Sequence, residues 1–85
     1  MENLIAVFNN RNQALQFASY LKRMGVSNKT ISTPRELSVS CGLSIIFLAS
    51  GIRQAEHVIR SNNFSGFIRF YRVVPNGMIK KYLPI

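Results

Sequence analysis

A segment near the start of the chain pairs a strand pattern with a full set of helix signals, and this pairing limits the available folds. The run Leu4-Ile5-Ala6-Val7-Phe8 is apolar with β-branched members and predicts a buried strand. We expect Asn10 to cap the helix that follows, with Gln13 returning the bond, and Gly25 to end it. Apolar residues recur between them at helical spacing, at Ala14, Phe17, Ala18, Leu21 and Met24.

The rest of the chain continues this alternation. Further strands are predicted over Lys29 to Ser32, Leu43 to Leu48 and Phe67 to Val74, and a second long helix, capped by Ser50, over Gly51 to Asn62. The order β-α-β-β-α-β predicts an α+β fold. We expect a ferredoxin-like two-layer sandwich, with two helices on one face of an antiparallel sheet.

The last residues predict an extension of this pattern. Pro75-Asn76-Gly77 is typical of a turn, and Met78 to Leu83 is expected to pair back as a short strand. We interpret residues 1–74 as one ferredoxin-like domain. Residues 75–85 are then a turn and tail, packed either on the sheet or in a homodimer contact.

Composition excludes several classes of chemistry. The chain carries 11 Lys+Arg against 3 Asp+Glu, a net charge of +8, and its only side-chain carboxylates are Glu2, Glu36 and Glu56. Hydrolysis by paired carboxylates needs two acids at one bond, and metal sites need several Cys, His or acidic ligands. We therefore expect no bound metal, and no organic cofactor is implied by the sequence.

Cys41 is the single cysteine, so no disulfide can form within the chain, and a reducing compartment is expected. The longest apolar run, Ile45 to Ala49, is far shorter than the ~20 residues that cross a bilayer. The start Met1-Glu2-Asn3 has no basic stretch of the kind that begins a signal peptide. These features predict a cytoplasmic protein without a membrane span.

The surroundings of Cys41 favour a thiolate. In the expected topology, the start of the third strand lies beside the exit of the first, so Cys41 should lie near Asn10 and Arg11 at the N-terminus of the first helix. Free N–H groups and about half a positive charge at such an end favour an anion, and Arg35 would add charge. Gly42 would let a partner's sulfur approach closely.

Two features oppose a reactive thiol. Thr33-Pro34-Arg35-Glu36 has the marks of a helix start, with Thr33 as cap and Glu36 closing a capping box, so Cys41 would sit near the negative end of a short helical turn. Many lone cysteines also simply pack as small hydrophobes. The hydroxyls of Ser38, Ser40 and Ser44 favour an exposed loop over a core position.

The segment Thr33-Pro34-Arg35-Glu36-Leu37-Ser38 followed by Ser40-Cys41-Gly42-Leu43-Ser44 resembles the signature of the putative selenium/sulfur carrier protein-like family. The resemblance extends from the first predicted strand through the fourth, while the tail from Pro75 to Ile85 does not match. It implies that Cys41 accepts sulfur or selenium as a persulfide-type adduct. Substrate and partner contacts are then expected from Thr33, Pro34, Arg35, Glu36, Ser38, Ser40 and Gly42, together with Asn10 and Arg11.

Other residues support weaker alternatives. His57, the only histidine, lies mid-helix and is interpreted as a solvated residue rather than a base for Cys41. Basic residues and aromatics such as Phe70 and Tyr71 would suit a nucleic-acid-binding module or weak polyanion binding. The favoured prediction is a carrier rather than an enzyme, with one protein donating sulfur or selenium and another accepting it.

Overall fold

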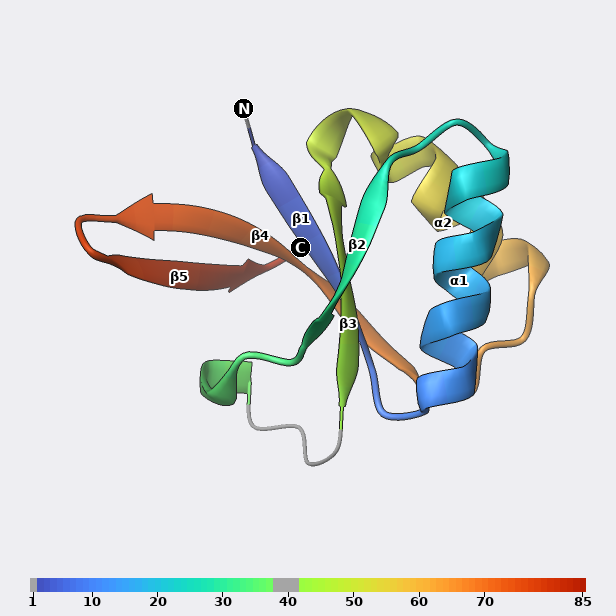
Figure 1. Cartoon of the computed structure of the whole chain (residues 1–85), viewed down its shortest axis with the longest axis horizontal. Helices are drawn as coiled ribbons and strands as arrows, with labels where there is room; N and C mark the ends of the chain where they lie inside the picture. Colours follow the sequence, from blue (N-terminus) through green and yellow to red (C-terminus); the bar gives the residue numbers. More distant parts are fainter. Residues whose placement is uncertain (1, 38–41) are drawn as a thin grey trace.

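The computed structural model describes residues 2–37 and 42–85 and shows an α+β arrangement (Figure 1). The expected fold class is therefore confirmed at the level of an antiparallel sheet covered by two helices. The strands are β1 (Asn3–Phe8), β2 (Asn28–Ser32), β3 (Leu43–Leu48), β4 (Phe67–Asn76) and β5 (Ile79–Pro84). The helices are α1 (Arg11–Arg23) and α2 (Ile52–Ser61), with short 3-10 turns at Arg35–Leu37 (η1) and Ala49–Gly51 (η2).

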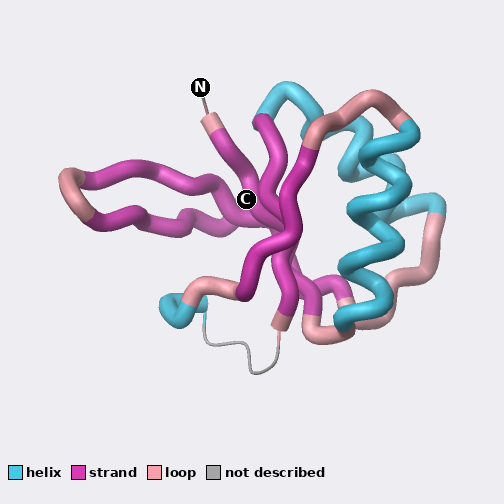
Figure 2. The backbone as a smooth tube through the Cα atoms, in the orientation of Figure 1, coloured by secondary structure: helices cyan, strands magenta, loops and turns pink. Residues whose placement is uncertain are grey.

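Within these residues the sheet has five strands in the order β2-β3-β1-β4-β5, and every neighbouring pair is antiparallel. Both helices lie on one side of this sheet, as the tube view also shows (Figure 2). The β4–β5 hairpin and η1 lie on the other side. We call the sheet face away from the helices the open face.

Helix α1 begins and ends at the predicted residues. The Asn10 side chain accepts a hydrogen bond from the Gln13 backbone N–H at 3.1 Å, as its capping role requires. Gly25 follows the helix with φ 83°, a left-handed conformation that suits glycine. The predicted return bond from Gln13 is wrong, because its side chain contacts Ser65 and Gly66 instead.

Helix α2 begins differently from the prediction. The residue before its first turn is Gly51, which makes no side-chain cap, and Ser50 lies inside η2. A close approach explains the glycine, because a Cβ on Gly51 would lie 2.7 Å from Cγ1 of Val26. The chain therefore enters α2 through a tight 3-10 turn rather than through a serine cap.

The core between helices and sheet is built around aromatic rings. Phe8 and Phe17 are fully buried with ring centroids 5.3 Å apart, and Phe64, Phe67 and Phe70 surround them. The expected inward stripe of α1 is confirmed for Ala14, Phe17 and Leu21, whereas Met24 is exposed. Alternate residues of β1, namely Leu4, Ala6 and Phe8, face this core.

The open face carries a second apolar cluster. Ile5, Val7 and Val73 are buried there, and partly buried side chains pack against them: Ile31, Leu37, Ile46, Tyr71 and Tyr82. Tyr82 comes from β5, which pairs with β4 as an edge strand. Pro75 and Asn76 belong to β4 rather than to the predicted turn, which is instead formed by Gly77, with φ 67°, and Met78.

Candidate functional site

The segment that contains Cys41 begins and ends at one well-defined point of the fold. Ser32, the last residue of β2, pairs with Leu43, the first residue of β3. Directly beyond this pair, the Thr33 backbone N–H donates a 3.4 Å hydrogen bond to the Gly42 carbonyl oxygen. Both ends of residues 33–42 are thus held together, while Ser38, Ser40 and Cys41 lie outside the described residues.

The first part of this segment forms a single 3-10 turn. The Leu37 N–H donates to the Pro34 carbonyl oxygen at 3.0 Å, and the Leu37 side chain packs on the open-face cluster. Arg35 and Glu36 are exposed beside it. The turn therefore places one cation and one anion on the open-face side, directly before the cysteine-containing residues.

The predicted capping role of Thr33 is wrong. Its hydroxyl lies 2.8 Å from the hydroxyl of Ser44, with which it shares a hydrogen bond. Ser44 is fully buried on β3, so it is not one of the exposed hydroxyls expected around the thiol. A hydroxyl this deeply buried needs a partner, and Thr33 supplies it.

Asn10 and Arg11 lie at the same end of the sheet. Phe8, the last residue of β1, pairs with Leu43, so α1 begins beside the ends of the 33–42 segment, as predicted. The Arg11 side chain is exposed in the helix layer, whereas Arg35 lies in η1 on the opposite side of the sheet. The two arginines therefore flank this end of the sheet from its two faces.

The N-terminus of α1 is partly occupied by the protein itself. One of its N–H groups, that of Gln13, already donates to Asn10. The Gln13 side chain accepts from the Gly66 N–H at 2.6 Å, and the Asn9 N–H donates to the Gly66 carbonyl oxygen at 2.8 Å. Asn10 is therefore engaged as a cap, and less of the helix end is open to an anion than a bare N-terminus would offer.

Comparison with known families adds a decisive observation to this geometry. A family model described as Putative Se/S carrier protein-like matches residues 3–67. The chain belongs to this family. No curated protein matches the chain, and no solved structure does either.

The family match has a clear boundary in the fold. It spans β1 to the first residue of β4, and so includes both helices and the whole 33–42 segment. The resemblance inferred from the sequence is thereby confirmed. The remainder of β4 and all of β5 lie outside the part that matches the Se/S carrier-like family.

The most useful feature that sequence reasoning missed lies in that remainder. A hollow of about 250 Å³ separates η1 from β5, lined by Glu36, Leu37, Lys80, Lys81, Tyr82 and Leu83. Burial of the Tyr82 phenol, together with the nearby Glu36 carboxylate, raises its pKa above the ordinary value of 10.0. The mixture of basic and apolar residues in β5 was a signal of a packed or binding strand, but no sequence pattern indicated that β5 lies opposite η1.

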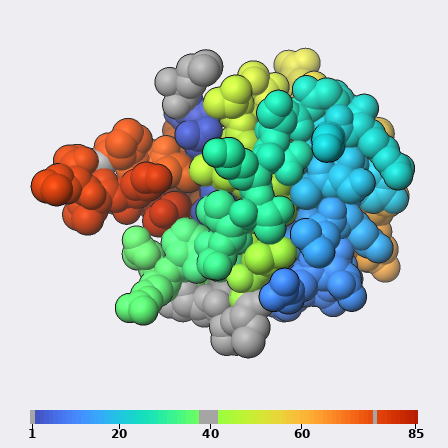
Figure 3. All heavy atoms as spheres, viewed as in Figure 1, coloured from blue at the N-terminus to red at the C-terminus, as the bar shows by residue number. Residues whose placement is uncertain are grey.

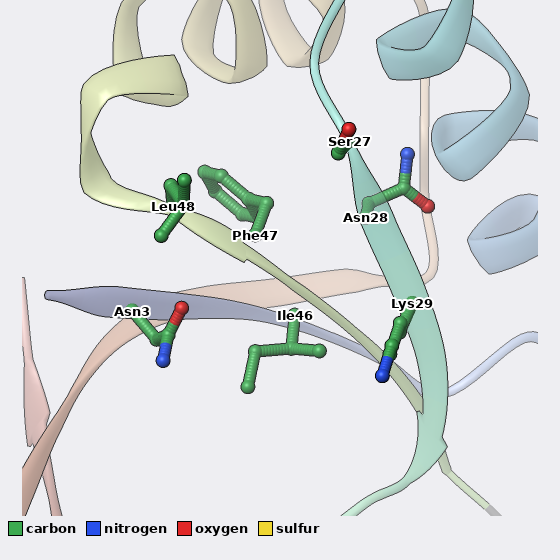
Figure 4. A pocket seen from close by; sticks show the side chains of 7 residues that line it. All are labelled: Asn3, Ser27, Asn28, Lys29, Ile46, Phe47 and Leu48. Carbon is green, nitrogen blue, oxygen red and sulfur yellow. The ribbon is translucent and has the colours of Figure 1, made fainter. Parts of the chain in front are cut away.

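A larger hollow lies at the other end of the sheet (Figure 4). It has a volume of about 340 Å³ and is lined by Asn3, Ser27, Asn28, Lys29, Ile46, Phe47 and Leu48. Leu48 ends the strand that Leu43 begins, about 17 Å away at ~3.3 Å per residue. This hollow is therefore remote from the cysteine-containing segment and plays no part in the site.

Other predicted features are placed as follows. His57 is exposed on α2, where its Nε2 lies 3.3 Å from the Ser61 hydroxyl. Among residues 2–37 and 42–85, no group of three or more His, Cys, Asp or Glu side chains is placed to hold a metal ion. The helices in these ranges are all too short or too polar to cross a bilayer.

Proposed function

We propose that this protein is a carrier of sulfur or selenium and that Cys41 is its carrier thiol. Membership of the Se/S carrier-like family is the observation that carries this proposal. Cys41 is also the one side chain of the sequence suited to covalent transfer without a cofactor. A carrier exchanges its cargo with other proteins, so a donor and an acceptor protein are the partners of this function.

The transfer is a thiol–persulfide exchange. The Cys41 thiolate attacks the terminal sulfur of a persulfide on the donor, a new S–S bond forms at Cys41, and the donor's own sulfur leaves as a thiolate. An acceptor thiolate then attacks the terminal sulfur on Cys41 in the same way and restores the free thiol. The exchange is balanced in atoms and electrons and needs no external oxidant.

Positive charge near the ends of the 33–42 segment supports this exchange. Exposed Arg11 and Arg35 flank the ends of the 33–42 segment, and a nearby guanidinium favours a thiolate over a thiol. The hydrogen bond between Thr33 and Gly42 holds the two ends of the segment together. Ser38, Ser40 and Gly42 are proposed as residues that contact the partner. The protein is proposed to be cytoplasmic.

We also propose that strands β1 to β4 and the two helices form a ferredoxin-like arrangement. Its support is the connectivity β1-α1-β2-β3-α2-β4 and the neighbour order β2-β3-β1-β4. On this interpretation residues 1–74 form the domain, and β5 is an addition at its edge. Nucleic-acid binding gains no comparable support, because the described open-face positions of β1 and β3 carry no aromatic residue: Asn3, Ile5, Val7, Ser44, Ile46 and Leu48.

The proposal is tested by treating the reduced protein with inorganic polysulfide and weighing it by intact mass spectrometry. We expect the wild type to gain the mass of one sulfur atom and Cys41→Ser to gain none. Iodoacetamide alkylation across pH should show a thiol pKa below about 8.5, the ordinary value. Arg35→Gln should raise this pKa, while Arg53→Gln on α2 serves as the matched control.

A thiol that reacts only after denaturation would contradict the proposal. So would a wild-type protein that reacts with iodoacetamide but never retains sulfur, because the cysteine would then be accessible without acting as a carrier.

A further inference from the structure

The C-terminal hairpin extends from the body of the molecule on the side away from the helices (Figures 1 and 3). Its outer strand β5 pairs with β4 and is the last strand of the sheet within the described residues. The hairpin also exposes large apolar side chains, namely Met78, Ile79, Leu83 and Ile85. Because β5 and these apolar residues lie outside the family-matched residues 3–67, the family match does not account for these features.

The phase of the β4–β5 ladder shows which backbone groups of β5 point outward. The Ile85 N–H donates to the Phe70 carbonyl oxygen at 3.1 Å. Hydrogen-bonded and non-bonded pairs alternate along an antiparallel ladder, so Leu83 and Lys81 are the next residues bonded to β4. The N–H and C=O groups of Lys80 and Tyr82 therefore point away from β4.

Proline placement agrees with this phase. Pro75, which has no N–H, is paired with Lys80 at a non-bonded position. Pro84 occupies the next outward position after Tyr82, where it removes one donor and limits the free edge to a short stretch. Lys80 and Tyr82 thus offer the backbone groups that an added strand would pair with.

The side chains around this edge define the partner's charge. Lys80 and Lys81 stand on the two faces of β5, and the hollow between β5 and η1 contains Glu36 as its single acid. A second copy of this chain would bring the same lysines to the edge, and like charges opposite each other are destabilising. An acidic partner is instead attracted electrostatically to a chain whose net charge is +8.

We propose that β5 is a docking strand for an acidic, extended segment of a partner protein. The segment adds to the sheet beside Lys80 and Tyr82, its acidic residues meet Lys80 and Lys81, and its apolar residues cover Leu83. The hollow places η1, which directly precedes the cysteine-containing residues, beside the docked segment. That this partner is the sulfur donor or acceptor rests on the proposed function.

Fluorescence anisotropy with a labelled peptide of repeated Glu-Glu-Val, which presents acids on both faces of a strand, tests the docking on the full chain. We expect saturable binding at low salt, weakened about tenfold or more in Lys80→Glu/Lys81→Glu. The matched control Lys22→Glu/Arg53→Glu, on the exposed helix layer, makes the same charge change and should alter binding by less than about twofold. A peptide N-methylated at every residue should not bind, since it has no backbone N–H left on either edge to pair with an edge strand.

Equal weakening by the control pair, or unchanged binding of the N-methylated peptide, would overturn the proposal. Displacement of the peptide by single-stranded DNA would assign the edge to nucleic acid. Self-association that is abolished in Lys80→Glu/Lys81→Glu would assign the edge to a second copy of the chain. If the peptide does not bind at all, the lysines would serve only to prevent aggregation at the edge. Each of these results also overturns the proposal.

The docking and the carrier function fail separately. Cys41→Ser should bind the peptide as the wild type does, and Lys80→Glu/Lys81→Glu should still take up sulfur from polysulfide. Loss of sulfur uptake alone therefore counts against the carrier function, and loss of peptide binding alone counts against the docking strand.

Discussion

The hydrogen bond between Thr33 and Ser44 ties the start of the cysteine-containing segment to β3. Ser44 is fully buried with its hydroxyl 2.8 Å from that of Thr33, whereas Thr33 is only partly buried. Loss of the bond therefore costs the two hydroxyls different amounts. The Thr33 hydroxyl can bond to water when its partner is removed, whereas the buried Ser44 hydroxyl cannot.

Thr33→Val is expected to lower the free energy of unfolding by about 1–3 kcal/mol, because it leaves the Ser44 hydroxyl buried without a partner. Ser44→Ala should cost less, and the double variant less than the sum of the two. Urea denaturation of the four proteins measures this cycle, with Ser32→Ala as an exposed neighbouring control. Additive losses would mean that the hydroxyls do not interact.

Helix α1 is held at its start by a turn that is distant in sequence. Gly66 exchanges hydrogen bonds with Asn9 and Gln13, and a Cβ on Gly66 would lie 2.7 Å from the Cβ of Asn10. This contact joins the segment before β4 to the helix end beside the proposed site. Glycine is required here by the close approach of two chain segments rather than by its backbone angles.

Gly66→Ala should lower the free energy of unfolding by about 1–3 kcal/mol, because the turn and the helix start must separate to admit the methyl group. Ser65→Ala removes only an exposed bond to Gln13 and should have a much smaller effect. Thermal and urea unfolding followed by circular dichroism compare the two variants. If Gly66→Ala leaves the free energy of unfolding unchanged, the turn can shift to admit the methyl group without loss of stability.

At the scale of the whole molecule, the two sides of the sheet are covered in different ways. Two helices cover one face, and single side chains from β5 and η1, Tyr82 and Leu37, close over part of the other. Tyr82 and Glu36 meet there although they lie far apart in the sequence. The ionisation of Tyr82 therefore reports on whether the hairpin stays packed over the open face.

The pKa of Tyr82 is raised in the folded protein by burial and by Glu36. A raised pKa means that the stability from protonated Tyr82 is complete below the unfolded value of about 10 and is lost as pH rises towards the folded pKa. Tyr82→Phe should therefore lose less stability above pH ~10 than the wild type does. Glu36→Gln should lower the pKa of Tyr82, measured by phenolate absorbance, and an unchanged titration would contradict the contact.

Local patterns in the sequence determined the helices and strands, because helix spacing, the Asn10 cap and the left-handed Gly25 act within a few residues of each other. The same reasoning placed the start of β3 beside the exit of β1, since the order of elements predicted a topology in which these two strands are neighbours. Membership of the family was likewise predicted from the sequence, and the match over residues 3–67 confirms it.

Only the tertiary structure decided which polar groups meet across long separations. The Gln13 side chain bonds to Gly66 rather than to the backbone of the Asn10 cap. The Thr33 hydroxyl bonds to Ser44 rather than capping the turn that follows it. Tyr82 and Glu36 come together because β5 and η1 line the same hollow on the side of the sheet away from the helices. Such contacts depend on the twist of the sheet and on the distance between chain segments. A linear pattern of residues specifies neither the twist nor these distances.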